Sequence, residues 1–336
     1  MTKILKVGVI GTGMIGQEHM RRIIDLVPNA MVTGVTDTNA DNAKQAASKA
    51  PNAKIFDNAE QLIASEDVDA VLICSWGGAH EEAILFALAA GKPIFCEKPL
   101  ADSQAACQRI IEAEVKLGKR LLQVGYMRRY DPAYKAMKDT IDSGRIGAPL
   151  IFHSVHRNAS VPDHYKGDMA ISDTMVHDID VSRWLLDAEV ARVRVVAAKK
   201  NSRGGGLRDP LMALLEMDNK ALASVEISVN IDYGYDIQGE ISAEKGSVSL
   251  GETNKVIVKS QGHFEGEIFT DWMLRFVEAY DVEIAMWAEA ARAGGVTGPS
   301  AWDGYAIQAV SDAAIKSADS GDVVELNIGE KPSIYL

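Results

Sequence analysis

From Leu5 onward, short β-branched runs alternate with longer segments whose apolar residues recur at helical spacing. This alternation is typical of a parallel sheet with crossover helices. Near-continuous apolarity in Val7–Ile10 and Ala70–Cys74 favours strands that are covered on both faces. The six predicted strands are Leu5–Ile10, Met31–Thr36, Ala53–Phe56, Ala70–Cys74, Pro93–Cys96 and Leu121–Gly125. The helical segments between them begin near Met14, Asn39, Asn58, His80 and Asp102.

After Tyr126 the pattern changes to alternating strand candidates between Ala191 and Lys259, separated by Gly, Asn and Asp turns, which indicates an antiparallel sheet. Examples are Ala221–Asn230, Asp236–Ala243 and Lys255–Lys259, with Gly204–Gly206 as a flexible connection. Amphipathic helices are expected at Pro132–Ser143 and Asp173–Leu186, and two further helical stretches at Thr270–Arg292 and Ala301–Ser320. The sequence therefore predicts an α/β protein, with a doubly wound parallel-sheet domain at residues 1–126 and an α+β domain at residues 127–336.

The charge balance limits which binding partners are plausible. The 336 residues include 47 acidic and 35 basic side chains, a net charge of −12, which argues against nucleic acid. Three cysteines, Cys74, Cys96 and Cys107, form neither a disulfide set nor a close-spaced metal cluster. No apolar run approaches the roughly 18 residues of a membrane helix, and no export leader is apparent. We expect a cytoplasmic protein.

The first strand runs directly into Gly11-Thr12-Gly13-Met14-Ile15-Gly16, a GxGxxG motif that opens the first predicted helix. Its glycines permit a tight turn, close approach of a pyrophosphate and close packing of helix on strand. Asp37 ends the second strand, where an acidic residue binds the adenosine ribose hydroxyls and disfavours a 2′-phosphate. The alternatives are a ligand-free glycine turn and, for Asp37, an N-cap or turn residue. We predict NAD rather than NADP.

Ligands of such sheets bind beyond the carboxyl ends of the strands. Ser75, Trp76 and His80 follow the fourth strand, and Glu97 and Lys98 follow the fifth. Lys98 is suited to hold a substrate hydroxyl and to stabilise alkoxide charge, and the alternative is that it is a surface lysine in a turn. For Trp76 and His80 the alternative to ligand contact is ordinary loop packing. The predicted cofactor-binding residues are Gly11, Gly13, Met14, Ile15, Gly16, Asp37, Ser75, Trp76, His80, Glu97 and Lys98.

Asp173 and His177 are spaced i and i+4, so on an α-helix they share one face and can share a hydrogen bond. A histidine supported by a carboxylate is a suitable general base for an alcohol proton. One alternative is a capping Asp with a core His. Another is a metal site with Asp178 and Asp180, but these fall on different faces and no further His or Cys completes the set, so no metal is predicted.

Polar residues in otherwise apolar segments suit a polyhydroxylated ligand, although a solvated sheet face would have the same pattern. They are Arg128, Arg129, His156, Asn158, Asp163, Tyr165, Tyr233 and Tyr235. The run Gly298–Tyr305 is typical of a turn and N-cap before a helix, with Trp302 as a packing residue or pocket wall.

The chain resembles the glucose–fructose oxidoreductase-like family almost from end to end. The glycine motif and Glu97-Lys98-Pro99 carry the family resemblance. Three further segments are similar to its inositol-oxidising branch: Met127–Asp131, Tyr233–Asp236 and Trp302–Tyr305. Departures are Tyr126, where Phe is more usual, and the segment Asn158–Pro162, which varies in the family.

The resemblance implies a Rossmann domain, an open-sheet C-terminal domain, NAD, and commonly a homotetramer packed through the C-terminal sheets. It implies Lys98, Asp173 and His177 as the catalytic set and oxidation of a ring hydroxyl of myo-inositol to the 2-keto-inositol. The expected substrate contacts are Lys98, Arg128, His156, Asn158, Asp173, His177 and Tyr235. Alternatives are a related dehydrogenase of scyllo-inositol, chiro-inositol or an aldose, and a non-catalytic NAD-binding sensor.

Overall fold

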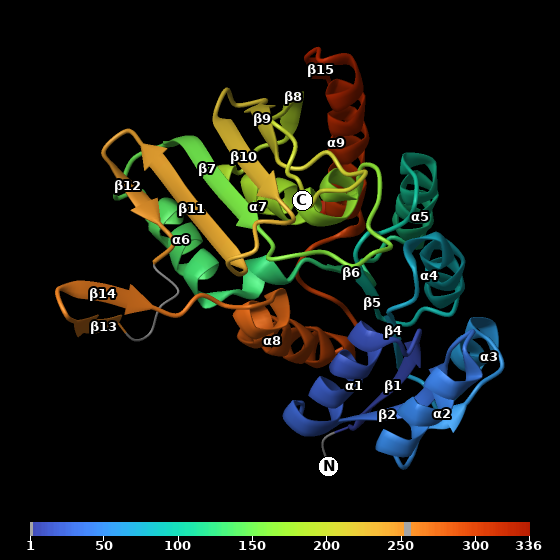
Figure 1. The fold of residues 1–336 in the computed structure, drawn as a ribbon. Coiled ribbons are helices and arrows are strands. Elements are labelled where there is room, and N and C mark those ends of the chain that lie inside the picture. The colour runs from blue at the N-terminus through green and yellow to red at the C-terminus, as the bar shows by residue number, and fades with distance from the viewer. Residues whose placement is uncertain (1–2, 252–256) are drawn as a thin grey trace. The chain divides into compact units, whose positions relative to one another are not determined.

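The computed structural model describes residues 3–251 and 257–336 (Figure 1). Its N-terminal part is a parallel six-stranded sheet in the order β3-β2-β1-β4-β5-β6, the doubly wound arrangement predicted from the sequence. The strands are β1 (Leu5–Ile10), β2 (Ala30–Thr36), β3 (Lys54–Ile55), β4 (Ala70–Ile73), β5 (Ile94–Glu97) and β6 (Leu122–Gly125). The connecting helices are α1 (Met14–Leu26), α2 (Ala40–Lys49), α3 (Ala59–Ala64), α4 (His80–Ala89) and α5 (Gln104–Leu117).

The predicted starts of the helices that connect these strands are confirmed, and side-chain caps fix three of them, those of α2, α3 and α5. Asn39 and Asn58 are the N-caps of α2 and α3, and each side chain accepts a backbone N–H of the first turn. Helix α5 begins two residues later than the expected Asp102. Ser103 is its N-cap and accepts the N–H of Ala106, so the serine rather than the aspartate ends the loop.

The second sheet has the order β12-β11-β7-β10-β9-β8-β15, and only the β7–β10 pair is parallel. Its strands are β7 (Pro149–Arg157), β8 (Val190–Ala197), β9 (Leu211–Met217), β10 (Leu222–Ser228), β11 (Asp236–Ala243), β12 (Gly246–Ser249) and β15 (Val324–Glu325). The predicted mostly antiparallel sheet is confirmed. Sequence reasoning missed the central strand β7, because its buried positions hold Ser154 and His156 beside Phe152 and so break the apolar alternation.

The predicted strand Lys255–Lys259 falls partly outside the described residues. Its described part belongs to β13 (Ile257–Ser260), which pairs with β14 (His263–Gly266) in a separate two-stranded sheet. The prediction had placed it in the large sheet.

The remaining helices are α6 (Pro132–Asp142), α7 (Val176–Leu186), α8 (Trp272–Arg292) and α9 (Ala301–Ser320). The α-helix predicted from Asp173 is corrected at its start, where Ala170–Met175 form a π-helical turn that leads into α7. The predicted cap of α9 is confirmed: the Asp303 carboxylate accepts the N–H and the hydroxyl of Ser300, at 2.7 and 2.8 Å.

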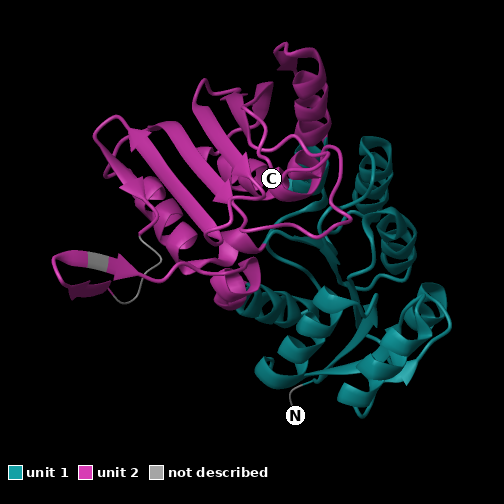
Figure 2. Cartoon of the chain, in the orientation of Figure 1, with its two compact units in different colours: residues 1–126, 280–308, 329–336 teal, residues 127–279, 309–328 magenta. Residues whose placement is uncertain are grey.

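The chain forms two compact units (Figure 2). The first comprises the residues up to Tyr126 together with Tyr280–Gln308 and Gly329–Leu336; the second comprises Met127–Ala279 and Ala309–Ile328. This division differs from the predicted one, which assigned everything after residue 126 to the second domain. The reason is packing, since four residues of α8 belong to the hydrophobic core of the first unit: Ile284, Trp287, Ala288 and Ala291.

Candidate active site

The turn between β1 and α1 has the geometry that the glycine motif predicts. Gly11 has φ +85°, and a Cβ there would lie 2.5 Å from the backbone nitrogen of Ser75. A Cβ on Gly16 would lie 2.1 Å from the Gly11 carbonyl oxygen, so this glycine permits close packing of helix on turn. A Cβ on Gly13 would meet nothing within 4 Å, and no side chain caps α1. An uncapped helix start beside the open space at Gly13 suits an anion such as pyrophosphate.

Asp37 lies against this turn. Its Oδ2 accepts the backbone N–H of Thr12 at 2.6 Å and the Thr12 hydroxyl at 3.1 Å. Its Oδ1 accepts the N–H of Asn39 at 2.7 Å, and Asn39 is itself the N-cap of α2. Asp37 is therefore not the N-cap of α2, but its carboxylate closes a local turn onto Asn39, as the turn alternative predicts. The same carboxylate is fixed beside the glycine turn.

His80 does not fit the predicted contact with a cofactor. Its side chain is wholly buried, and its two ring nitrogens lie 2.8 Å from the carbonyl oxygens of Ser75 and Pro99. Burial lowers the pKa of His80. His80 instead joins the loop after β4 to the loop after β5. Trp76, in the first of these loops, is 74% exposed and remains open to a ligand.

The Glu97 carboxylate faces the interior rather than a ligand. Its Oε1 lies 2.7 Å from Nε2 of His19, a buried residue of α1. Its Oε2 accepts the backbone N–H of Lys98 at 3.1 Å. Sequence reasoning missed His19, although its position one turn after Gly16, on the side of α1 that faces the sheet, could have indicated it. Lys98 is half-buried at the end of β5.

In the second unit, Asp173 accepts a hydrogen bond from the Tyr165 hydroxyl, which also lies 2.7 Å from the Thr174 hydroxyl. Burial, together with the charge of Asp173, raises the pKa of Tyr165 and keeps this phenol a donor. Asp173 stands in the π-helical turn and His177 in the first turn of α7. The α-helical geometry assumed for the pair is thus replaced by a wider turn, and their hydrogen bond stays a prediction.

Three of the predicted substrate contacts are brought together inside the second unit. Arg128 is 1% exposed, and its Nη1 donates to Oδ1 of Asp178 at 2.7 Å. His156 Nδ1 lies 2.7 Å from the other oxygen of Asp178, and the Tyr235 hydroxyl lies 3.3 Å from His156 Nε2. We call Arg128, His156, Asp178 and Tyr235 the buried network. It fastens α7 to β7, so its polar atoms are largely occupied by one another.

The electrostatics of the buried network follow from its burial. Desolvation raises the pKa of Asp178, but the nearby Arg128 and His156 outweigh it and hold that pKa well below its usual range. Burial also raises the pKa of Tyr235 to about 12. Asp180 is likewise paired, with Arg129. Within residues 3–251 and 257–336, no group of three metal-ligating side chains occurs.

Asn158, another predicted substrate contact, is not part of the buried network. Its backbone N–H bonds the Ser228 carbonyl at 2.8 Å, which fixes the residue just after β7. Its side-chain Oδ1 is buried and accepts no hydrogen bond from the described residues. A buried oxygen of this kind suits a ligand hydroxyl.

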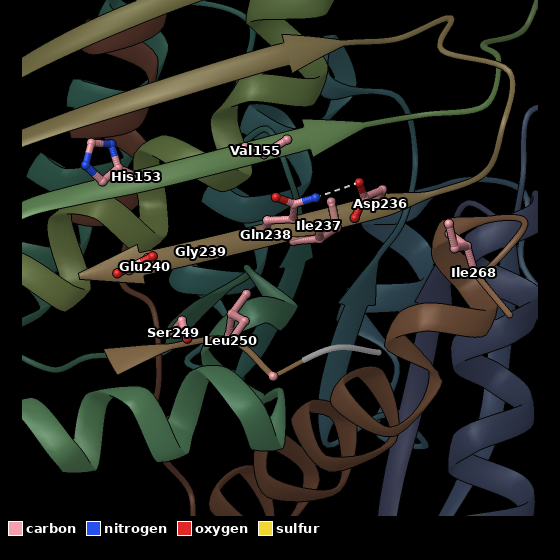
Figure 3. A pocket seen from close by; sticks show the side chains of 11 residues that line it. His153, Val155, Asp236, Ile237, Gln238, Gly239, Glu240, Ser249, Leu250 and Ile268 are labelled. Atoms are coloured by element: carbon pink, nitrogen blue, oxygen red, sulfur yellow. Dashed lines mark hydrogen bonds between the residues drawn. The ribbon is translucent and has the colours of Figure 1, made fainter. Parts of the chain in front are cut away.

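A pocket of about 520 Å³ lies at the β11 side of the second sheet (Figure 3). His153 and Val155 of β7 and Gln238 and Glu240 of β11 are among its lining residues. The described residues that line this pocket include no predicted cofactor-binding or catalytic residue.

Comparison with known proteins defines the class. Residues 5–126 match the family model described as "Oxidoreductase family, NAD-binding Rossmann fold", and residues 138–326 match "Oxidoreductase family, C-terminal alpha/beta domain". The chain belongs to this Gfo/Idh/MocA oxidoreductase family. The predicted family, its NAD-binding Rossmann domain and its C-terminal α/β domain are confirmed.

Individual relatives show which members of the family the chain is similar to. The chain is 47% identical to a protein of Pseudomonas fluorescens SBW25 named inositol 2-dehydrogenase, over 98% of this chain and 99% of that one. It is 46% identical, with the same coverage, to an inositol 2-dehydrogenase of Serratia proteamaculans. Among solved structures, myo-inositol dehydrogenase from Lactobacillus casei in complex with NAD(H) and myo-inositol matches with a TM-score of 0.96 and 36% identity, covering 99% and 100% of the two chains.

Proposed function

We propose that this oxidoreductase oxidises a ring hydroxyl of myo-inositol to the 2-keto-inositol (an inosose), with NAD as hydride acceptor. The observation that carries the proposal is full-length similarity, at 47% identity, to a protein named inositol 2-dehydrogenase. The likeness to a structure that holds NAD(H) and myo-inositol supports the same substrate class.

Residues of the first unit would hold the cofactor. The open space at Gly13 and the uncapped start of α1 suit its pyrophosphate, and Asp37 suits the adenosine ribose. NAD held there would supply the hydride acceptor for oxidation of the carbinol carbon. The negative charge of Asp37 opposes a 2′-phosphate, which favours NAD over NADP.

Lys98, Asp173 and His177 are the proposed catalytic residues. His177 accepts the hydroxyl proton, and Asp173 orients the imidazole and stabilises its protonated form. Lys98 donates a hydrogen bond to the oxygen on which negative charge develops. Tyr165 fixes the Asp173 carboxylate by donating to it. Asn158, with its buried side-chain oxygen, binds a second ring hydroxyl.

The test is a steady-state comparison of myo-, scyllo- and chiro-inositol and glucose, each with NAD and with NADP. We expect the highest kcat/KM for myo-inositol with NAD. His177→Ala should lower kcat by about 10²–10⁴-fold. A higher kcat/KM for another isomer or for glucose would identify a related dehydrogenase instead. NAD binding without turnover on any of the four would identify a sensor.

We also propose a cytoplasmic homotetramer. Helices α6 and α7 lie behind the second sheet in Figure 1, and on its other face Val196, Met212 and Leu214 are 53%, 43% and 39% exposed. These side chains are the apolar surface that a second copy would cover. Cys74, Cys96 and Cys107 are buried, and none of them is part of a disulfide in the described residues, which suits a reducing compartment. No helix within the described part of the chain is long and apolar enough to cross a membrane.

A further inference from the structure

Helix α1, which begins at the glycine turn, is connected to Lys98 by a short hydrogen-bonded path. His19 of this helix is wholly buried, and its Nε2 lies 2.7 Å from Oε1 of Glu97. A carboxylate oxygen accepts, so the histidine donates from Nε2. The second carboxylate oxygen accepts the Lys98 backbone N–H at 3.1 Å. One carboxylate thus joins the helix to the peptide of the lysine.

The surroundings hold this path in one geometry. The His19 ring packs edge-on against Phe95, with 5.5 Å between ring centroids, and lies 5.8 Å from the ring of Tyr280. Opposite Glu97 on β6 stands Gly125, where a Cβ would lie 3.3 Å from the Glu97 carboxyl carbon and 3.0 Å from Phe95. The neighbouring strand therefore leaves room for the buried carboxylate.

We propose that His19 and Glu97 form a clamp that fixes Lys98 relative to the glycine turn. His19 is a positioning residue, because it acts through Glu97 on the lysine. The clamp rests on the proposed function, in which Lys98 anchors the reacting oxygen. A hydrogen bond to a carboxylate is stronger than a neutral one and suits this purpose. A displacement of about 1 Å in a catalytic group can cost about 10²-fold in rate.

Two substitutions at one position separate positioning from packing. His19→Leu keeps an apolar side chain in the core but removes the donor, whereas His19→Gln keeps an N–H donor that reaches Glu97. For His19→Leu we expect kcat with myo-inositol to fall by about 10- to 100-fold. The Kd for NAD, measured by quenching of protein fluorescence, should stay unchanged. His19→Gln should restore most of the turnover.

The clamp is overturned if His19→Leu keeps its turnover, or if both variants lose turnover and NAD affinity in parallel with thermal stability. Where His19→Leu fails to fold, His19→Asn replaces it, because its amide is one methylene too short to reach Glu97. It should show the same loss of kcat, and full turnover in this variant would also overturn the clamp.

Lys98→Ala, measured in parallel, separates the two proposals. Full turnover in Lys98→Ala would overturn the role proposed for the lysine and the clamp with it. Loss of turnover in Lys98→Ala with full turnover in His19→Leu would overturn the clamp alone. Loss in both, with rescue by His19→Gln, is the expected result.

Discussion

The ion pair between Arg128 and Asp178 can be broken by Asp178→Ala. Asp178 is 0% exposed and accepts from Arg128 at 2.7 Å and from Ser154 at 2.8 Å, with His156 at 2.7 Å. Removing the carboxylate leaves a buried guanidinium without its counter-charge, which costs about 3–5 kcal/mol of the free energy of unfolding. Loss of the Ser154 and His156 partners acts in the same direction.

The expected thermal shift follows from that free energy. At about 2–4 °C per kcal/mol for a unit of this size, the midpoint should fall by roughly 6–20 °C in a melt followed by circular dichroism. Asp139→Ala is the control, because it breaks the exposed i,i+4 pair between Lys135 and Asp139, and such pairs contribute little. Its midpoint should stay unchanged.

A double variant tests the reasoning itself. Arg128→Met combined with Asp178→Ala removes both charges of the pair, so it should be more stable than Asp178→Ala alone. If the double variant is as unstable as the single one, the loss of stability in Asp178→Ala does not come from the uncompensated charge of Arg128.

The same pair predicts a pH dependence with a definite sign. The pKa of Asp178 in the folded protein is lower than in the unfolded chain, so its contribution to stability is complete above the ordinary carboxyl pKa. That contribution is lost as the pH falls toward the folded pKa. The difference in melting midpoint between the wild type and Asp178→Ala should therefore be constant near neutrality and shrink as the pH falls below about 4. A constant difference over that acid range would contradict this.

Three further predictions concern the cofactor and the assembly. Gly13→Ala should fold normally but bind NAD weakly, because its Cβ would enter the open space proposed for the pyrophosphate. Gly16→Ala should also lower thermal stability, because its Cβ would lie 2.1 Å from the Gly11 oxygen. Equal NAD affinity in Gly13→Ala and wild type would contradict pyrophosphate binding at the glycine turn. Asp37→Ala should raise the Kd for NAD and raise the ratio of kcat/KM with NADP to kcat/KM with NAD. An unchanged ratio would show that Asp37 does not contact the adenosine ribose. Leu214→Arg should reduce the mass measured by light scattering from that of a tetramer, and a monomeric wild type would overturn the proposed assembly.

Much of the first unit was predictable because its signals are local. Asn39 and Asn58 cap helices from the next residue onward, and Gly11 takes the positive φ that a tight turn requires. The return of α8 to the first unit was not predictable in the same way. Its apolar face, which includes Trp287, has the same spacing whichever core it packs against.

The predicted substrate residues show where sequence reasoning stops for physical reasons. A polar residue in an apolar segment indicates only that some partner must satisfy it, and either a ligand or the protein itself can do so. For His156 the partner is Asp178, which stands 22 positions away, and for Arg128 it is the same carboxylate at 50 positions. For Asn158 the described residues supply no partner to its buried Oδ1. The three looked alike in sequence, and the difference lies entirely in long-range packing. Asn158→Ala should therefore raise the KM for the polyol with little loss of stability, whereas His156→Ala should lower the melting midpoint, because it removes a partner of a buried carboxylate.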